Sequence, residues 1–181
     1  MNSYRMKSSR IFLCGMMGTG KSAVGKELAR LLNQPFTDLD KQIEASLSAS
    51  VSEIFQSKGE LFFRGMEQEV LSRFIRSKRG VLALGGGTLQ NQQITDSVKS
   101  SGILIYINTP LPILLERLQR NNRRPLLHGL TPDQLKQKIL QLTSEREIFY
   151  SQADIIAEGR SLPAAVTARS IYQKLQTISQ E

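Results

Sequence analysis

The sequence predicts an α/β fold, a three-layer αβα sandwich around a five-stranded parallel sheet. Short apolar runs alternate along the chain with segments whose apolar residues recur every three or four positions, which is the period of amphipathic helices. The apolar runs are nearly continuous, as is typical of strands that helices bury on both faces of a parallel sheet. Because the 181 residues contain no internal repeat and no linker-like stretch, we expect one domain over residues 1–181.

Each element of this sandwich has its own signal. Strands are expected at the apolar runs 11–14, 36–39, 81–84, 103–107 and 154–157, and helices over 21–33, around 51–58 and 61–77, and over 111–119 and 164–178. A further helix begins at Thr131, where Pro132 and Gln134 complete a capping box. Ligands of such sheets bind at the carboxyl ends of the strands, so the polar residues there are the candidates for a site.

The composition narrows the class of protein. The net charge of +8 invites a nucleic-acid interpretation, but the charge is dispersed, and the chain has no Trp and only 6% aromatic residues to stack on bases. The second explanation of the positive charge is that several arginines bind a small polyanionic ligand. The single Cys14 excludes an internal disulfide and predicts a buried thiol. The apolar run IFLC that ends with Cys14 is too short to be the core of a signal peptide or a membrane span, so we expect a cytoplasmic protein.

Residues 15–22, GMMGTGKS, fit the pattern GxxxxGK(S/T) between a predicted strand and a predicted helix. This is the context that a phosphate-binding P-loop requires. Its glycines let successive backbone N–H groups surround a phosphate at the helix N-terminus, while Lys21 reaches the β- and γ-phosphates and the hydroxyl of Ser22 becomes a magnesium ligand. The predicted nucleotide site comprises Gly18, Thr19, Gly20, Lys21, Ser22 and Ala23.

The stretch FTDLD, residues 36–40, ends the second strand with two acids. Side chains alternate along a strand, so Asp38 and Asp40 are expected to point the same way. Two like charges on one face are unfavourable unless a cation or hydrogen-bond donors lie between them. Because this is the first strand after the P-loop helix, one acid is expected to help hold magnesium and the other to face a phosphate acceptor. A solvated turn or a helix cap is the alternative.

Two arginines interrupt apolar helical patterns. Arg64 lies between Phe63 and Met66, and the alternative to a ligand contact is a surface cation whose stem covers the core. Arg146 occupies a slot in the apolar stripe that runs from 135 to 149, where a buried aliphatic residue is expected. A cation in that slot needs an anion, which either an acidic side chain or a ligand carboxylate or phosphate supplies.

Two loops complete the candidate site. Gly85, Gly86 and Gly87 follow the third strand, where they allow backbone N–H groups to approach a ligand closely. A merely flexible loop is the alternative. The basic segment around 122–130 is bounded by predicted helices, and we expect it to act as a lid that closes arginines over ATP and excludes water.

Together these motifs resemble those of the shikimate kinases. GMMGTGKS, DLD, GELFFR followed by a glutamate, GGG, RRPLL and the ERxxxY pattern of Glu145, Arg146 and Tyr150 occur in that family's order and approximate spacing over about residues 10–160. The P-loop alone is unspecific, whereas the combination is highly specific. The resemblance implies a P-loop kinase fold with strand order 2-3-1-4-5. It also implies ATP-dependent phosphorylation of the 3-hydroxyl of shikimate, in the chorismate route to aromatic amino acids. For the oligomeric state, the resemblance implies a monomer.

The resemblance also assigns the acceptor site. Asp40, Arg64, Gly86 and Arg146 match the family's shikimate-binding positions, within or facing a helical segment at about 40–78. Shikimate carries one carboxylate, for which two arginines are natural partners, and three hydroxyls from which an aspartate can accept hydrogen bonds.

On the nucleotide side, Ser22 matches the family's magnesium ligand and Asp38 the acid that reaches magnesium through water. Arg124 matches the lid arginine on the ATP phosphates. The resemblance thus implies that Asp40, Lys21 and Arg124 are catalytic, the first at the attacking hydroxyl and the other two at the phosphates.

Two alternatives stay open. A nucleotide or gluconate kinase shares a P-loop and a lid, and only a panel of acceptors with ATP separates it from a shikimate kinase. A nucleotide-regulated module that binds nucleic acid would instead bind DNA or RNA tightly, with a steep dependence on salt.

Overall fold

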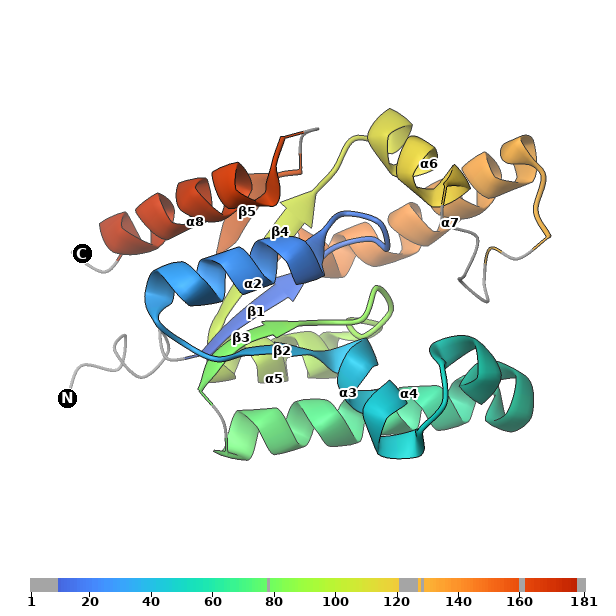
Figure 1. Cartoon of the computed structure of the whole chain (residues 1–181), viewed down its shortest axis with the longest axis horizontal. Coiled ribbons are helices and arrows are strands. Elements are labelled where there is room, and N and C mark those ends of the chain that lie inside the picture. The colour runs from blue at the N-terminus through green and yellow to red at the C-terminus, as the bar shows by residue number, and fades with distance from the viewer. Residues whose placement is uncertain (1–9, 78, 121–126, 128, 160–161, 179–181) are drawn as a thin grey trace.

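The parallel sheet forms as the sequence predicts. The computed structural model describes residues 10–77, 79–120, 127, 129–159 and 162–178, and its five parallel strands lie in the order β2-β3-β1-β4-β5 (Figure 1). The strands are β1 (Arg10–Cys14), β2 (Phe36–Asp38), β3 (Gly80–Ala83), β4 (Ile103–Asn108) and β5 (Ile155–Glu158). Each lies within one residue of its expected bounds.

The alternation of side chains divides the two faces of the sheet between two groups of helices. In β1, Ile11 and Leu13 point to one face and Phe12 and Cys14 to the other, and all four are buried. Two helices, α2 (Lys21–Leu32) and α8 (Ala164–Ile178), cover the first face. The second face is covered by the other five helices: α3 (Leu39–Leu47), α4 (Val51–Ser77), α5 (Gln92–Ser101), α6 (Leu111–Gln119) and α7 (Pro132–Tyr150). Burial on both faces explains the continuous apolar strands.

One expectation about the second strand is wrong. β2 ends at Asp38, whose side chain accepts a hydrogen bond from the backbone N–H of Lys41 and so caps the N-terminus of α3. Asp40 therefore lies in the first turn of a helix, and strand alternation does not align the two acids. The helix-cap alternative is correct for Asp38, because a helix follows that the apolar pattern does not predict.

Local chemistry explains the other helix ends. α4 turns sharply at Gly59, where φ is 81° and ψ is 170°, a conformation reserved for glycine, and this confirms the expected division into two helical stretches. The capping box of α7 is present, since the side chain of Thr131 accepts from the N–H of Gln134 and the reverse bond also forms. α5 begins at the cap Asn91, and its largely polar sequence gives no helical signal.

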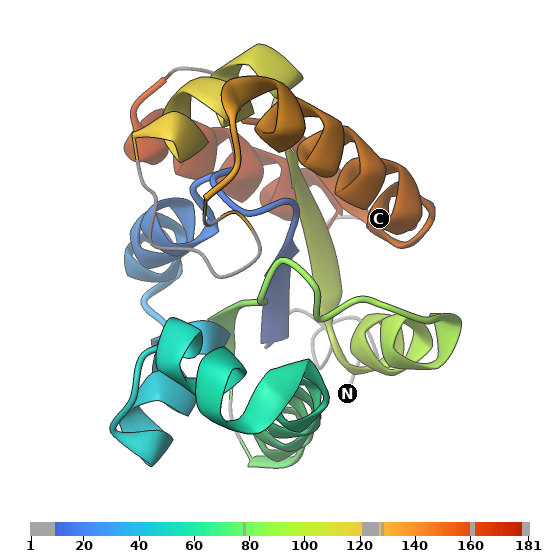
Figure 2. The ribbon, with the colours of Figure 1, turned by 90° about the vertical axis from the view of Figure 1, so that its right-hand side faces the viewer.

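The carboxyl ends of the strands share one edge of the sheet. Figure 2 faces this edge, with α6 and α7 on one side of it and α3 and α4 on the other. β1 leads into the P-loop, β2 into the two acids and β3 into the three glycines. Parallel pairing therefore gathers these motifs in one place. Within the described ranges no helix has the length and apolarity needed to cross a membrane.

Gly80→Ala should destabilise the fold strongly. Gly80 begins β3 with a φ of +127°, and a Cβ there would lie 2.3 Å from the carbonyl oxygen of Pro35. Because backbone strain and a backbone clash add, we expect a loss of about 2–4 kcal/mol in the free energy of unfolding. Gly65→Ala in α4 is the control, since no atom lies within 4 Å of its Cβ position, and it should gain about 0.5–1 kcal/mol. Urea denaturation measures both, and equal stabilities would contradict the packing seen at β3.

Candidate functional site

The P-loop joins β1 to α2 and leaves the start of that helix ready for an anion. Gly18 and Gly20 have φ values of 84° and 90°, which allow the tight turn. No side chain caps α2 at Gly20, so its first N–H groups remain for a phosphate. The ammonium group of Lys21 donates to the carbonyl oxygens of Gly15 and Met16, at 2.8 and 3.0 Å, and thereby lies across the loop.

Asp38 joins the P-loop to the acceptor side of the site. One of its carboxylate oxygens caps α3, and the other accepts a hydrogen bond from the hydroxyl of Ser22. Both residues line a cavity of about 260 Å³ together with Lys21, Asp40 and Gly86. The structure therefore brings the predicted phosphate and magnesium residues together with Asp40 and Gly86 of the predicted acceptor site.

The oxygen donors here suit magnesium better than a fully protein-caged metal. The described residues contain no group of three or more His, Cys, Asp or Glu that could hold a metal ion. A hydroxyl from Ser22 and a carboxylate from Asp38 are hard oxygen ligands. Magnesium typically takes one or two such groups and completes its shell with water and substrate phosphates, so the donor set fits this ion.

Arg117 is a cavity residue that the sequence pattern does not reveal. It comes from α6, lines the same cavity and donates from Nη1 to the carbonyl oxygen of Gly18 at 3.1 Å. An arginine on an amphipathic helix is ordinarily a solvated residue, and only the packing of α6 beside the P-loop gives it a functional position.

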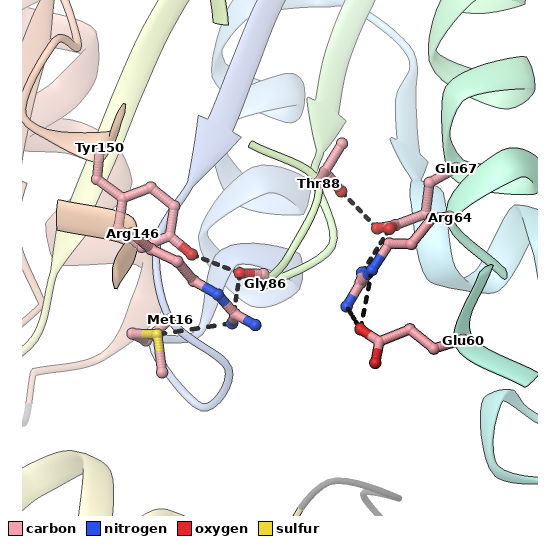
Figure 3. A network of polar contacts seen from close by, with 8 residues as sticks. All are labelled: Met16, Glu60, Arg64, Glu67, Gly86, Thr88, Arg146 and Tyr150. Atoms are coloured by element: carbon pink, nitrogen blue, oxygen red, sulfur yellow. Dashed lines mark hydrogen bonds and ion pairs between the residues drawn. The ribbon is translucent and has the colours of Figure 1, made fainter. Parts of the chain in front are cut away.

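Arg64 lies in a second cavity, of about 320 Å³, between two acids of its own helix. Its side chain is only 14% exposed. Nη1 donates to Glu67 at 2.5 Å, and Nε and Nη2 donate to one oxygen of Glu60 at 3.2 and 2.7 Å (Figure 3). Burial opposes the charge of Arg64, but the two acids outweigh burial and raise its pKa above the ordinary value. A surface cation is therefore the wrong interpretation of Arg64.

Glu67 is a residue to which the sequence analysis assigns no role. It is almost completely buried, and its oxygen that does not bind Arg64 accepts a hydrogen bond from the hydroxyl of Thr88 at 2.6 Å. A buried carboxylate needs such partners. Glu67 follows Arg64 by three residues, one helical turn, which lets the two side chains meet.

Arg146 projects from α7 into the same second cavity. Its Nη1 donates to the carbonyl oxygen of Gly86 at 2.8 Å and lies 3.9 Å from the sulfur of Met16. Across the described part of the chain, no carboxylate forms a salt bridge with Arg146. The alternative that Arg146 forms an internal ion pair therefore gains no support. A ligand carboxylate or phosphate remains the candidate anion for its charge.

The three glycines after β3, which we name the glycine turn (Gly85, Gly86 and Gly87), lie where the two cavities meet: Gly86 lines the first cavity and Gly87 lines the second. A Cβ on Gly85 would lie 2.3 Å from Glu67 and 2.7 Å from Asp40, and one on Gly87 would lie 2.7 Å from Arg64. Charged side chains thus pack directly against the backbone. The alternative of a merely flexible loop does not fit this packing.

The predicted lid lies largely outside the described residues. This applies to Arg124 and to most of the segment at 122–130. Leu127, which is described, is buried. Cys14 is buried as expected, and burial raises the pKa of its thiol.

Comparisons with known proteins agree with this geometry. The model of a family described as shikimate kinase matches residues 17–176. A shikimate kinase of Chloroherpeton thalassium is 36% identical over 175 residues, which cover 94% of each chain. The solved structure of a shikimate kinase from Acinetobacter baumannii in complex with shikimate is 34% identical, covers 99% of this chain and 100% of its own, and has a TM-score of 0.89. A gluconokinase from Sinorhizobium meliloti shares the fold at 15% identity and a TM-score of 0.60, over 97% of this chain and 95% of its own.

Proposed function

The chain belongs to the shikimate kinase family, and we propose that it transfers the γ-phosphoryl group of ATP to the 3-hydroxyl of shikimate, within the chorismate route to aromatic amino acids. One observation carries the choice of acceptor: Arg64 and Arg146 line the same cavity, on either side of Gly86 (Figure 3). Two guanidinium groups that face one space suit a small carboxylate. Shikimate kinase relatives support the same acceptor.

On the nucleotide side, the phosphates of ATP are proposed to bind the N–H groups at the start of α2. Lys21 would exchange the two carbonyl oxygens that it now contacts for phosphate oxygens, which attract its charge more strongly. Arg117 adds a positive charge beside Gly18, and Arg124 is proposed to close over the phosphates from the lid. Ser22 and Asp38 would hold magnesium, which when bound neutralises charge on the phosphate oxygens.

Asp40 is proposed to act on the acceptor. Its carboxylate lies against Gly85 and lines the cavity that also holds Lys21. From there it would accept a hydrogen bond from the attacking hydroxyl, orient it for in-line transfer and take up its proton. The arginines would fix the opposite end of the molecule, so that only one hydroxyl lies near the phosphate.

A panel of acceptors tests the proposal. Purified protein is incubated with ATP, magnesium and, in turn, shikimate, gluconate and nucleoside monophosphates, and the release of ADP is measured. We expect ADP release with shikimate and at least a hundredfold less with the others, roughly the loss when a charged partner is left unpaired. Turnover with gluconate or a nucleotide at the rate with shikimate would overturn the proposal. Salt-dependent binding to DNA or RNA without turnover would favour the nucleic-acid alternative.

Asp40→Asn and Asp38→Asn should have different phenotypes. Asparagine keeps the shape of aspartate but loses its charge and its capacity to take a proton. Asp40→Asn should reduce kcat by at least about a hundredfold and weaken shikimate binding, with Mg-ATP binding nearly unchanged. Asp38→Asn should raise the magnesium concentration needed for activity, while α3 keeps its cap because asparagine caps helices as well as aspartate does.

Calorimetry for each ligand and steady-state kinetics across a magnesium titration separate these two phenotypes. If the phenotypes came out exchanged, the assignment of the acids would be reversed. If neither variant differed from wild type, Asp38 and Asp40 would have no role in the reaction and would only stabilise the N-terminus of α3.

Glu60→Gln should strengthen shikimate binding. Glu60 occupies the Nε and Nη2 edge of Arg64, an edge that a ligand carboxylate would use, so the ligand has to displace it. Because Glu60 is 55% exposed, removal of its charge should lower the Kd for shikimate by about two- to fivefold, the scale of an exposed ion pair. Glu69→Gln is the control, since Glu69 pairs with Arg73 at the same spacing in α4 but lines neither cavity.

Calorimetry at low salt measures the Kd in both variants. Weaker binding in Glu60→Gln would instead mean that Glu60 holds Arg64 in place for the ligand.

A further inference from the structure

The carbonyl oxygen of Gly86 receives two hydrogen bonds from one helix. The hydroxyl of Tyr150 donates to it at 2.5 Å and Nη1 of Arg146 at 2.8 Å (Figure 3). The two donors are four residues apart in α7, so they lie on the same face, one turn apart. A carbonyl oxygen has two lone pairs, and both are used here. The direction of this carbonyl is thereby fixed by α7.

Tyr150 is itself held firmly in the core. It is 1% exposed, and its ring packs against the ring of Tyr106 with centroids 5.2 Å apart. Burial raises its pKa above the ordinary value, so the hydroxyl keeps its proton. No other acceptor is recorded for the Tyr150 hydroxyl in the described residues, and a buried hydroxyl without one is costly. The buried hydroxyl of Tyr150 therefore depends on the Gly86 carbonyl for its hydrogen bond.

Gly86 connects the two halves of the site. It lines the cavity that holds Lys21 and Asp40, and the next residue, Gly87, lines the cavity that holds the two arginines. A Cβ on Gly86 would lie 3.2 Å from the backbone nitrogen of Met17, so the glycine turn abuts the P-loop. A rotation of the Gly86 carbonyl would remove the hydrogen bond that holds Arg146 and would also shift the wall between the cavities.

We infer that Tyr150 is a positioning residue for the acceptor: its hydroxyl fixes the Gly86 carbonyl, and this carbonyl aims Arg146 at the acceptor carboxylate. Tyr150 does not touch the acceptor in this arrangement. Its loss should therefore weaken acceptor binding and leave the nucleotide site alone. The inference rests on the proposed function, because it takes shikimate as the ligand of Arg146.

Tyr150→Phe tests the inference, with Tyr106→Phe as a matched control. Each removes one hydroxyl from the same pair of packed rings, but the hydroxyl of Tyr106 donates to Glu147 and not to the glycine turn. We expect the Kd and KM for shikimate to rise about five- to tenfold in Tyr150→Phe, the scale of one lost hydrogen bond. Binding of an ATP analogue should stay within twofold of wild type, and kcat should change less than KM. Tyr106→Phe should bind both ligands as wild type does.

Two results would overturn the inference. The first is wild-type affinity for shikimate in Tyr150→Phe. The second is an equal loss of shikimate affinity in Tyr106→Phe, which would mean that both tyrosines act only through packing. Melting temperatures establish that each variant is folded at the temperature of the assay. Should Tyr150→Phe not fold, Tyr150→Met lacks the same hydroxyl, fills the space with a flexible chain and carries the same expectation. Failure of wild-type protein to bind shikimate would instead overturn the proposed function.

Discussion

The candidate site depends on a backbone segment that carries no side chains. Carboxylates and guanidinium groups from α3, α4 and α7 all reach the glycine turn, and at Gly85 and Gly87 a single added carbon would collide with them. A wall made of backbone cannot change rotamer, so the positions of the charged groups are set by the helices and by β3. The two cavities therefore meet at neighbouring residues of this turn, since Gly86 lines the first cavity and Gly87 lines the second.

The two arginines are held in different ways. Arg64 is balanced by two acids on its own helix, whereas Arg146 is held by a carbonyl oxygen and, within the described residues, by no carboxylate. A partly buried cation without an anion is costly to maintain. The carboxylate of the proposed acceptor would therefore gain most from Arg146, since the charge of Arg64 is already compensated by Glu60 and Glu67. In the proposed function, α7 would thus contribute more to the affinity for the acceptor than α4 does.

The sequence predicted those features that obey local rules. The P-loop, the five strands, the capping box at Thr131 and the two stretches of α4 follow from patterns within a few residues of each other. Asp38 and Asp40 lie at the predicted edge of the sheet, but Asp40 lies in a helix and not in the strand, because α3, which the apolar pattern does not predict, begins between them. Arg117 could not be identified from spacing, and Glu67 and Tyr150, which stand within the motifs, could not be given a role there. A buried side chain and an exposed one look alike in a sequence until the neighbouring elements are packed.

The strand order has a consequence for how the protein is assembled. β1 is the central strand, yet its neighbours β3 and β4 come from far along the chain, where Arg10 pairs with Gly80 and Ile11 with Ile103. Contacts between distant residues carry the full entropy of closing long loops, so they form late and slowly. On the ribosome, β1 and the P-loop emerge before either neighbour has been synthesised. The first motif to be translated is therefore among the last to acquire its working geometry, and until then the apolar strand before it stays exposed to other chains.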